Sequence, residues 1–317
     1  NSNSTIEEIL KILNTKNKNK EIKCLPLVDN NLRIIDISTK EKIRAYPLAE
    51  PIIGEQELAN IVDVIKTGWI SSRGAYITKF EKKFQEYLGG GHAVAISNGT
   101  NALQIGLMAL GIKKGDEVIV PNFTFGGSIN AILNCGAVPV IADVCLKNWT
   151  LNLENVKKKL TKKTKAIMPV HIYGQPYEIS SIKKFAKKKK LLIVDDCAEA
   201  IGGKYKGKTV GLENDCACFS FFANKTITTG EGGMAIFKKK IYATKARLLI
   251  NLIRSYYILE QLNYDKNRLK KLKRFICNLE NTPLPGSLHN DLDHFVNSFG
   301  EKINTFRVNR NKRGWVS

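Results

Sequence analysis

The stretch HAVAISNGTNALQIGLMAL, residues 92–110, shows the pattern that decides the fold. A short apolar run comes first, as in a buried strand, and a longer amphipathic run with helical spacing follows it. The alternation continues with expected strands at DEVIVP (116–121), VPVIADV (138–144), AIMPVHIYG (166–174), LLIVDD (191–196), ACFSFF (217–222) and GMAIF (233–237). Helices are expected between them at GGSINAILNCG (126–136), LENVKKKL (153–160) and EISSIKKFAKKKK (178–190). This order predicts an α/β fold whose mostly parallel sheet is covered by helices on both faces.

A sheet of this kind binds its ligands beyond the carboxyl ends of its strands, so the residues there form the candidate site. Lys225 follows the expected strand 217–222 and precedes the glycine-rich turn TTGEGG (228–233). We expect this lysine at a buried strand end, where burial disfavours the ammonium form and makes the amine nucleophilic. Lysines in such places form Schiff bases with aldehydes.

Two other strand ends suit a phosphate. Gly99 and Thr100 stand at the start of the first expected helix, where backbone amides, a hydroxyl and the positive helix end come together. Ser220 lies near the end of the strand that precedes Lys225. The alternative for Thr100 is an ordinary helix cap.

Aromatic and acidic residues follow two further strands. Phe125 lies in a glycine-rich loop and could cover a flat ligand, although a core aromatic is the alternative. Asp195 and Asp196 end the strand 191–196, and Glu199 comes shortly afterwards. A carboxylate there can hold a proton on a ring nitrogen, and the alternative is again a helix cap.

These signals converge on one ligand, pyridoxal 5′-phosphate (PLP), because it needs a phosphate cradle, a ring cover, a carboxylate and an amine together. Its phosphate would lie at Gly99, Thr100 and Ser220, and its ring under Phe125. Its pyridine nitrogen would then face an acid at the end of the strand 191–196, and its aldehyde would reach Lys225.

Residues 47–250 resemble the DegT/DnrJ/EryC1/StrS family of sugar-nucleotide aminotransferases, which are fold type I PLP enzymes. The resemblance rests on PLAEPIIGEQEL, TGWISSRGAYITKFEKKF, AVAISNGTNALQIGLMALGI, GDEVIVPNFTF, KAIMPVHIYGQP, VDDCAEAIGG and FSFFANKTITTGEGGM, in the family's order and spacing. It implies that Lys225 binds the cofactor covalently and moves protons, and that Asp196 rather than Asp195 faces the ring nitrogen. Glu199 stands where relatives have His, Gln or Glu beside the ring.

The resemblance also implies a reaction and partners. Glutamate would donate its amine, and the 4-keto group of a nucleotide-linked 6-deoxysugar would accept it, as in polysaccharide and O-antigen biosynthesis. The enzyme would be a cytoplasmic homodimer. A lysine at position 225 favours transamination over the dehydration catalysed by relatives with histidine there.

The chain divides into three predicted parts. Residues 1–45 resemble the closing part of a CBS domain, and a linker with a local hairpin is the alternative. Residues 46–254 form the PLP-binding large domain. Residues 255–317 depart from the family's C-terminal domain, which leaves a second hypothesis of an inactive or truncated remnant that keeps the fold.

Composition excludes several other functions. The 317 residues are 43% hydrophobic and carry a formal net charge of +21, with twelve lysines and two glutamates in residues 151–190. The lysine runs contain no interleaved aromatics, which favours a solvated basic surface over a nucleic-acid site. Seven scattered cysteines without paired CxxC motifs indicate a reduced protein without a zinc site. No run is apolar enough for a membrane span, and no signal peptide is expected.

Overall fold

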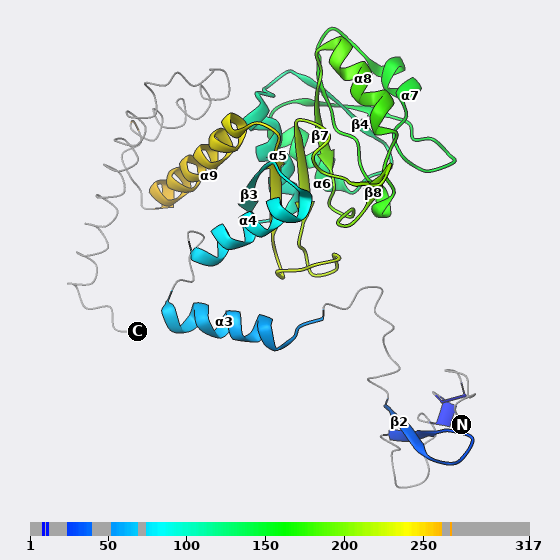
Figure 1. Cartoon of the computed structure of the whole chain (residues 1–317). Coiled ribbons are helices and arrows are strands. Elements are labelled where there is room, and N and C mark those ends of the chain that lie inside the picture. The colour runs from blue at the N-terminus through cyan, green and yellow to red at the C-terminus, as the bar shows by residue number, and fades with distance from the viewer. Residues whose placement is uncertain are drawn as a thin grey trace, which may run out of the picture. The chain divides into compact units, whose positions relative to one another are not determined.

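The computed structural model describes residues 8–9, 11–12, 24–39, 52–68, 74–261 and 267. The chain divides into two compact units, Asn1–Ile52 and Ile53–Ser317. Figure 1 shows the elements of both units, which are described here separately. The predicted C-terminal part, 255–317, lies outside the described residues except for the end of one helix and Asn267.

The first unit contains an antiparallel hairpin of β1 (Cys24–Val28) and β2 (Ile34–Thr39). Asp29 closes its turn, since its Oδ1 accepts hydrogen bonds from the amides of Asn31 and Arg33 at 2.8 and 2.9 Å. A hairpin is therefore present in this part of the chain, which both the CBS-like interpretation and the alternative of a linker with a local hairpin allow. The relation of this hairpin to a CBS domain stays a prediction.

The second unit is built on a seven-stranded sheet with the order β3-β11-β10-β7-β6-β4-β5. Its strands are β3 (His92–Ile96), β4 (Glu117–Pro121), β5 (Val138–Ala142), β6 (Thr164–Ile167), β7 (Leu192–Asp196), β10 (Cys216–Ser220) and β11 (Gly233–Phe237). Only β11 runs antiparallel to its neighbours. The predicted α/β class and the mostly parallel sheet are thus confirmed.

Among the strands that are shorter than expected, two affect the site. The stretch AIMPVHIYG was predicted as one strand over 166–174, but β6 ends at Ile167 and only a bridge between Val170 and Asp196 continues the pairing. Pro169 has no amide to donate to the sheet, and a 3₁₀ turn follows at Ile172–Gly174. β10 stops at Ser220 instead of Phe222, since the chain then turns away toward the loop that carries Lys225.

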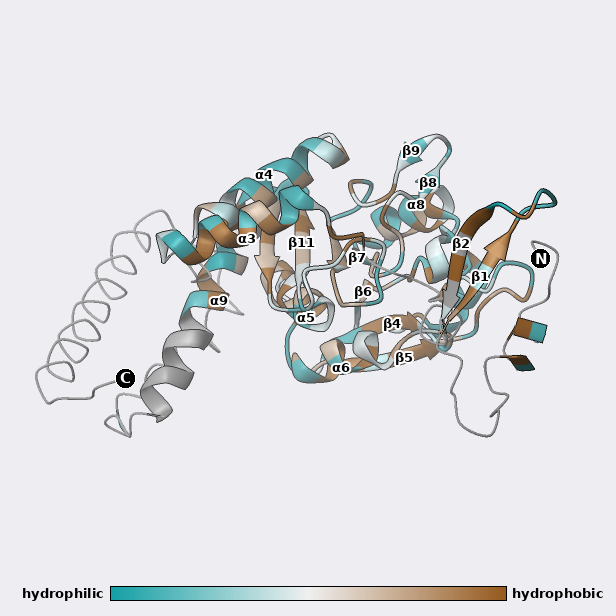
Figure 2. Ribbon diagram, turned by 90° about the horizontal axis from the view of Figure 1, so that it is seen from below, coloured by the Kyte–Doolittle hydropathy of each residue, from teal (hydrophilic) through white to brown (hydrophobic). Residues whose placement is uncertain are grey.

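Helices cover both faces of the sheet (Figure 1). One face packs against α5 (Gly99–Leu110), α6 (Gly126–Asn134) and α9 (Lys240–Gln261), and the other against α4 (Ala75–Leu88), α7 (Leu153–Lys159) and α8 (Ile179–Lys189). A further helix, α3 (Glu55–Thr67), precedes α4, and the small hairpin of β8 (Lys204–Tyr205) and β9 (Lys208–Thr209) follows β7. In Figure 2 the strands β4 and β5 are predominantly apolar. The inner strand β4 is buried, as expected for a strand covered on both faces, whereas Val138 and Ile141 of the edge strand β5 are exposed.

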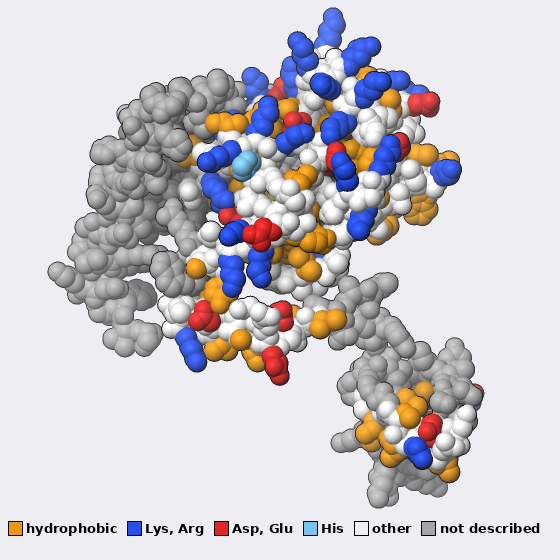
Figure 3. All heavy atoms as spheres, viewed as in Figure 1, with side chains coloured by type: hydrophobic (Ala, Val, Ile, Leu, Met, Phe, Trp, Pro, Cys, Tyr) orange, Lys and Arg blue, Asp and Glu red, His pale blue; other side chains and the backbone are white. Residues whose placement is uncertain are grey.

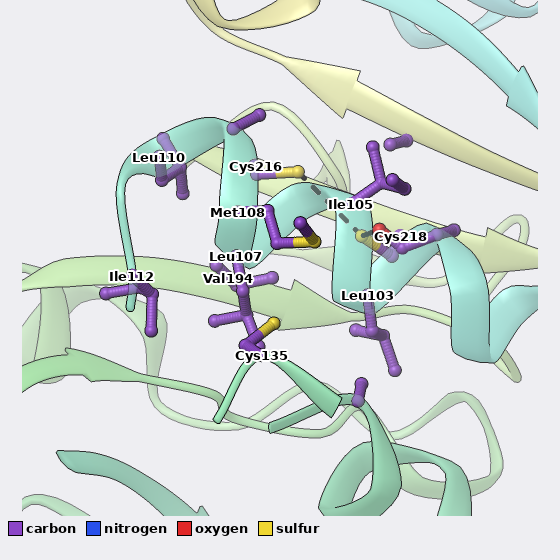
Figure 4. Packing of buried hydrophobic residues seen from close by; sticks show 14 of the residues in the cluster. Leu103, Ile105, Leu107, Met108, Leu110, Ile112, Cys135, Val194, Cys216 and Cys218 are labelled. Carbon is purple, nitrogen blue, oxygen red and sulfur yellow. Dashed lines mark hydrogen bonds between the residues drawn. The ribbon is translucent and has the colours of Figure 1, made fainter. Parts of the chain in front are cut away.

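α5 packs beside Cys216 and Cys218 of the sheet (Figure 4). The close packing depends on Gly106. A Cβ atom at Gly106 would lie 3.1 and 3.2 Å from the sulfurs of Cys216 and Cys218. These two cysteines occupy alternate positions of β10, both buried, with their sulfurs 3.8 Å apart. The close approach places the N-terminus of α5 directly at the end of β10, which matters for the site.

Basic residues gather on the surface of α7 and α8, in the upper part of Figure 3. Both helices end in lysines, at 157–159 and 187–189. Within the described ranges, no helix is long and apolar enough to cross a membrane. The same part of the chain holds no group of three His, Cys, Asp or Glu side chains arranged for a metal ion.

Candidate active site

A cleft of about 670 Å³ opens at the carboxyl ends of the central strands. Its wall comes from the loops after β3, β4, β6, β7 and β10, which the sheet order brings together around β7 and β10. All seven residues predicted for the site line this one cleft, namely Gly99, Thr100, Phe125, Asp196, Glu199, Ser220 and Lys225.

The N-terminus of α5 forms one end of the cleft. Asn98 caps the helix, since its side chain accepts the Asn101 amide at 2.8 Å, so the alternative of Thr100 as the cap is wrong. The amides of Gly99 and Thr100 have no hydrogen-bond acceptor within the described residues. Unpaired amides and a positive helix end together suit an anion such as a phosphate.

Glycines keep this end of the cleft open. A Cβ atom at Gly99 would lie 2.9 Å from Cβ of Ser220, so only glycine lets the helix approach β10 this closely. A Cβ atom at Gly127 would lie 2.7 Å from Oγ1 of Thr100. The hydroxyl groups of Thr100 and Ser220 therefore lie beside the free amides, where the glycine backbone leaves the space open.

Asp196 lies at the centre of the cleft and is held by two donors. Its Oδ2 accepts a hydrogen bond from Ser128 Oγ at 2.7 Å, and its Oδ1 accepts the Ala198 amide at 3.1 Å. Ser128 in turn lies 2.7 Å from Thr124 Oγ1. Burial raises the pKa of Asp196 above its ordinary value, and the two hydrogen bonds oppose that rise. No helix begins here, so the alternative of a helix cap is wrong.

Asp195 faces the other side of the sheet. Its carboxylate accepts hydrogen bonds from Tyr177 Oη at 2.8 Å and from Asn214 Nδ2 at 2.9 Å. Burial raises its pKa to about 7. His171 lies beside it, with Nε2 3.9 Å from Asp195 Oδ1, and neither ring nitrogen has a hydrogen-bond partner in the described structure. The register of β7 thus leaves Asp196 alone to face the cleft.

Lys225 departs from the expectation of a buried amine. It lies five residues beyond the end of β10, and its side chain is 19% exposed. Its Nζ donates to Glu199 Oε1 at 3.1 Å, and Glu199 Oε2 accepts the amide of Tyr173 at 3.1 Å. The amine is therefore a partly exposed, paired group on a loop, because β10 ends earlier than its apolar sequence suggests.

Phe125 is not a core aromatic. It is 80% exposed at the start of α6 and lines the cleft. Phe123, which also lines the cleft, packs edge-on against Trp149 with ring centroids 5.3 Å apart. A flat ligand in the cleft would therefore find an exposed ring at its rim.

Sequence reasoning missed several residues of this cleft. Asn98, Thr124, Gly127, Ser128 and Tyr173 all line it. The hydroxyl residues and the glycine follow β4 in the stretch 122–128, whose position after a strand was a usable signal. The sequence held no such signal for Tyr173, because this residue was predicted inside the strand 166–174, whereas β6 ends at Ile167.

A helix end with unpaired amides, a fixed carboxylate and a paired lysine amine in one cleft are an arrangement typical of a cofactor-binding α/β domain of the fold type I class. The chain belongs to the DegT/DnrJ/EryC1/StrS aminotransferase family, whose model matches residues 51–261. This match also covers the end of α9, beyond the predicted boundary at residue 254.

Individual relatives agree with the family. GDP-perosamine synthase of Vibrio cholerae is 48% identical over 205 residues, which are 65% of this chain and 56% of the relative. The aminotransferase structure from Psychrobacter cryohalolentis matches with a TM-score of 0.62 and 35% identity, over 64% of this chain and 52% of that one. The chain thus spans about half the length of the relatives it matches.

A cofactor-bound relative is also similar. The PLP form of Spr1654 from Streptococcus pneumoniae matches with a TM-score of 0.59 and 32% identity, over 62% of this chain and 54% of that one. Relatives of this chain therefore bind PLP, and the residues present in the cleft fit that group. The free amides of α5 suit its phosphate, Asp196 suits its ring nitrogen, and Lys225 suits its aldehyde.

Proposed function

We propose that this chain carries the PLP site of a sugar-nucleotide aminotransferase that resembles GDP-perosamine synthase. Glutamate would donate the amine, and the 4-keto group of a nucleotide-linked 6-deoxysugar would accept it. A cytoplasmic homodimer is part of the same proposal. The observation that supports it best is the shared cleft of Lys225, Asp196 and the N-terminus of α5.

The phosphate end of the cofactor would be held by the chain's own backbone. The amides of Gly99 and Thr100 donate toward the cleft from the positive end of α5, and Ser220 adds a hydroxyl. Placing the phosphate there fixes the distance between the rest of the cofactor and the carboxyl ends of β7 and β10.

Asp196 would hold a proton on the ring nitrogen. Ser128 orients its carboxylate, and burial strengthens its attraction for a cationic partner because water competes less. PLP bound in this way supplies an electron sink for the carbon that exchanges its amine. Asp195 does not compete for this role, since it is engaged with Tyr177 and Asn214.

Lys225 would provide the amine that holds the cofactor and moves the proton during transfer. Glu199 lies at hydrogen-bond distance from this amine and is itself fixed by the Tyr173 amide. The carboxylate can therefore orient the lysine and stabilise the positive charge of its amine whenever the amine is protonated.

The similarity of this chain to its relatives narrows the choice of sugar substrate. Three GDP-perosamine synthases are 46–48% identical to this chain over about two thirds of its length. The stretches DDCAEA (195–200) and NKTITTGEGGM (224–234), which surround the cleft, also resemble those enzymes most within the family. A GDP-linked 4-keto-6-deoxysugar is accordingly the substrate that we propose.

The two half-reactions test the proposal separately. PLP-loaded protein is mixed with glutamate, and 2-oxoglutarate is measured; a GDP-linked 4-keto-6-deoxysugar is then added, and the aminated sugar is identified by mass spectrometry. Both products are expected, and both should be lost in Lys225→Ala. Cofactor binding without either product would contradict the proposed activity and favour the hypothesis of an inactive protein that keeps the fold.

A further inference from the structure

A second hollow of about 520 Å³ adjoins the cofactor cleft. It lies between the loop after β5 and the 3₁₀ turn after β6, and it shares Ile172 and Tyr173 with the cleft. Its wall is formed by Lys147, Asn148, Trp149, Ile172, Tyr173 and Gln175. The side chains of these residues have no role in holding the cofactor as proposed above, although the Tyr173 amide fixes Glu199.

Two bulky aromatic residues of this hollow have an unusual backbone. Trp149 has φ 57° and Tyr173 has φ 48°, in the left-handed region that such residues rarely adopt. The other described non-glycine residues with positive φ also lie in turns or at a helix end, namely Leu32 between β1 and β2, Lys190 at the end of α8 and Lys206 between β8 and β9. Both residues lie in tight turns, since the Trp149 amide donates to the Cys145 carbonyl at 2.7 Å and Tyr173 lies in the 3₁₀ turn Ile172–Gly174, and these turns carry the two rings to the hollow.

The same two residues present exposed rings. Trp149 is 54% exposed and Tyr173 is 76% exposed. Phe123 packs edge-on against both, with ring centroids at 5.3 and 6.4 Å, and Phe123 itself lines the cofactor cleft. One ring of the cleft therefore fixes the position of two rings that remain open to a ligand.

The chemistry of the hollow suits a nucleotide. Exposed aromatic rings stack on nucleobases, and side-chain amides such as those of Asn148 and Gln175 can bond to the edge of a base. The ammonium of Lys147 suits the negative charge of a diphosphate. Half of the lining residues are polar or charged, whereas the core of a subunit interface is depleted in charge.

We infer that this hollow binds the nucleotide of the sugar substrate, with the base stacked on Trp149 or Tyr173 and the diphosphate near Lys147. The inference rests on the proposed function, because it presupposes a nucleotide-linked substrate. The inference places the nucleotide beside the cofactor. The sugar, at the other end of the diphosphate, would then reach the cleft by passing Ile172 and Tyr173.

Calorimetric titration of the PLP-loaded protein with GDP tests the inference, with UDP and dTDP as further probes. Loss of one stacked ring in Trp149→Ala should weaken GDP binding roughly tenfold, since stacking contributes about 1–3 kcal/mol per base. Trp149→Phe should restore part of the affinity. Lys147→Ala should weaken binding of GDP more than that of guanosine, and the difference should shrink at high salt.

Leu146→Ala is the matched control, because Leu146 is 90% exposed in the same loop and does not line the hollow. Its GDP affinity should equal that of the unchanged protein. Equal affinity in Trp149→Ala and the unchanged protein would overturn the inference. A change of molecular mass in solution without a change in GDP affinity would also overturn it and assign the rings to a subunit contact.

The cofactor spectrum separates this outcome from failure of the proposed function. Trp149→Ala should bind PLP as the unchanged protein does, since Trp149 does not line the cleft. If the unchanged protein binds PLP but not GDP, the nucleotide site is refuted and the cofactor site stands. If it binds GDP through Trp149 but not PLP, the proposed function fails and the hollow stands as a nucleotide site.

Discussion

Lys225 Nζ lies 3.1 Å from Glu199 Oε1, in a pair whose side chains are 19% and 29% exposed. The pair joins the loop after β10 to the turn after β7, and the Tyr173 amide extends it to the 3₁₀ turn. The amine that would react with the cofactor is thus held in place by a carboxylate from a different strand end.

Glu199→Gln tests this arrangement. The amide keeps an acceptor for Tyr173 but loses the charge that holds the ammonium, so the free energy of unfolding should fall by about 0.5–1 kcal/mol in urea. Glu231→Gln serves as control, since Glu231 also lines the cleft but its carboxylate makes no ion pair within the described structure. Equal effects of the two substitutions would contradict a specific role for Glu199.

Asp196→Asn should weaken PLP binding. The asparagine can still accept from Ser128, but it cannot hold a charged partner on the ring nitrogen. A hydrogen bond to a charged group contributes about 1.5–3 kcal/mol, so the dissociation constant of PLP should rise roughly 10- to 100-fold.

The control for this experiment is Asp143→Asn. Asp143 follows β5 and accepts from Asn122 at 2.9 Å, away from the cleft lining. Absorbance titration with PLP should give the same dissociation constant for this variant and the unchanged protein. If Asp196→Asn also binds PLP unchanged, the ring nitrogen does not face Asp196.

Gly99→Ala should damage both packing and the phosphate site. Its Cβ would lie 2.9 Å from Cβ of Ser220, so the free energy of unfolding should fall by about 1–3 kcal/mol. Gly126→Ala is the matched control, because a Cβ there meets nothing within 4 Å.

The double variant Gly99→Ala/Ser220→Gly separates the two effects. Removing the Ser220 side chain relieves the contact with the new Cβ, so stability measured in urea should recover. PLP affinity should stay low, because the phosphate has lost a hydroxyl. Full recovery of affinity would show that the phosphate binds elsewhere.

His171 should make the protein less stable in acid. Burial lowers its pKa to about 4, below the ordinary value near 6.5, so the unfolded chain binds the proton more readily between these values. Stability from this group is present above pH 6.5 and is lost as the pH falls toward 4.

His171→Leu removes this contribution. The free energy of unfolding of the variant and of the unchanged protein is measured by urea denaturation at pH 5 and at pH 8. The difference, variant minus unchanged protein, should be about 2 kcal/mol more positive at pH 5 than at pH 8. The comparison across pH cancels any constant cost of repacking beside Tyr177. A difference that does not depend on pH would mean that folding leaves the pKa of His171 unchanged, and a loss at pH 5 relative to pH 8 would mean that His171 is protonated in the folded state, paired with Asp195.

The fold was predictable because each apolar strand is short and continuous and is followed by a turn or helix. The same pattern placed Gly99, Asp196 and Lys225 at strand ends, which the sheet brings to one edge. The contact between Ser128 and Asp196 spans 68 residues and depends on how α6 is rotated, which no local pattern contains. The residues alone did not decide whether Asp195 or Asp196 faces the cleft, because a one-residue change of register exchanges the two faces of a strand.

The partial exposure of Lys225 could not be predicted from the sequence either. The apolar run to Phe222 suggested a strand, but Ser220 ends β10 and the loop turns toward Glu199. Such a loop is set by its tertiary partners. Lys225 pairs with Glu199, which the Tyr173 amide fixes in turn, and both residues lie in other parts of the chain.

The most direct test of the central claim is to trap the cofactor on the protein. The chain is incubated with a slight excess of PLP, reduced with borohydride, digested and mapped by mass spectrometry. We expect stoichiometric modification of Lys225, and little modification of the many surface lysines because they lack a phosphate site beside them. Modification spread over lysines such as 187–190, with Lys225 unmodified, would contradict the account.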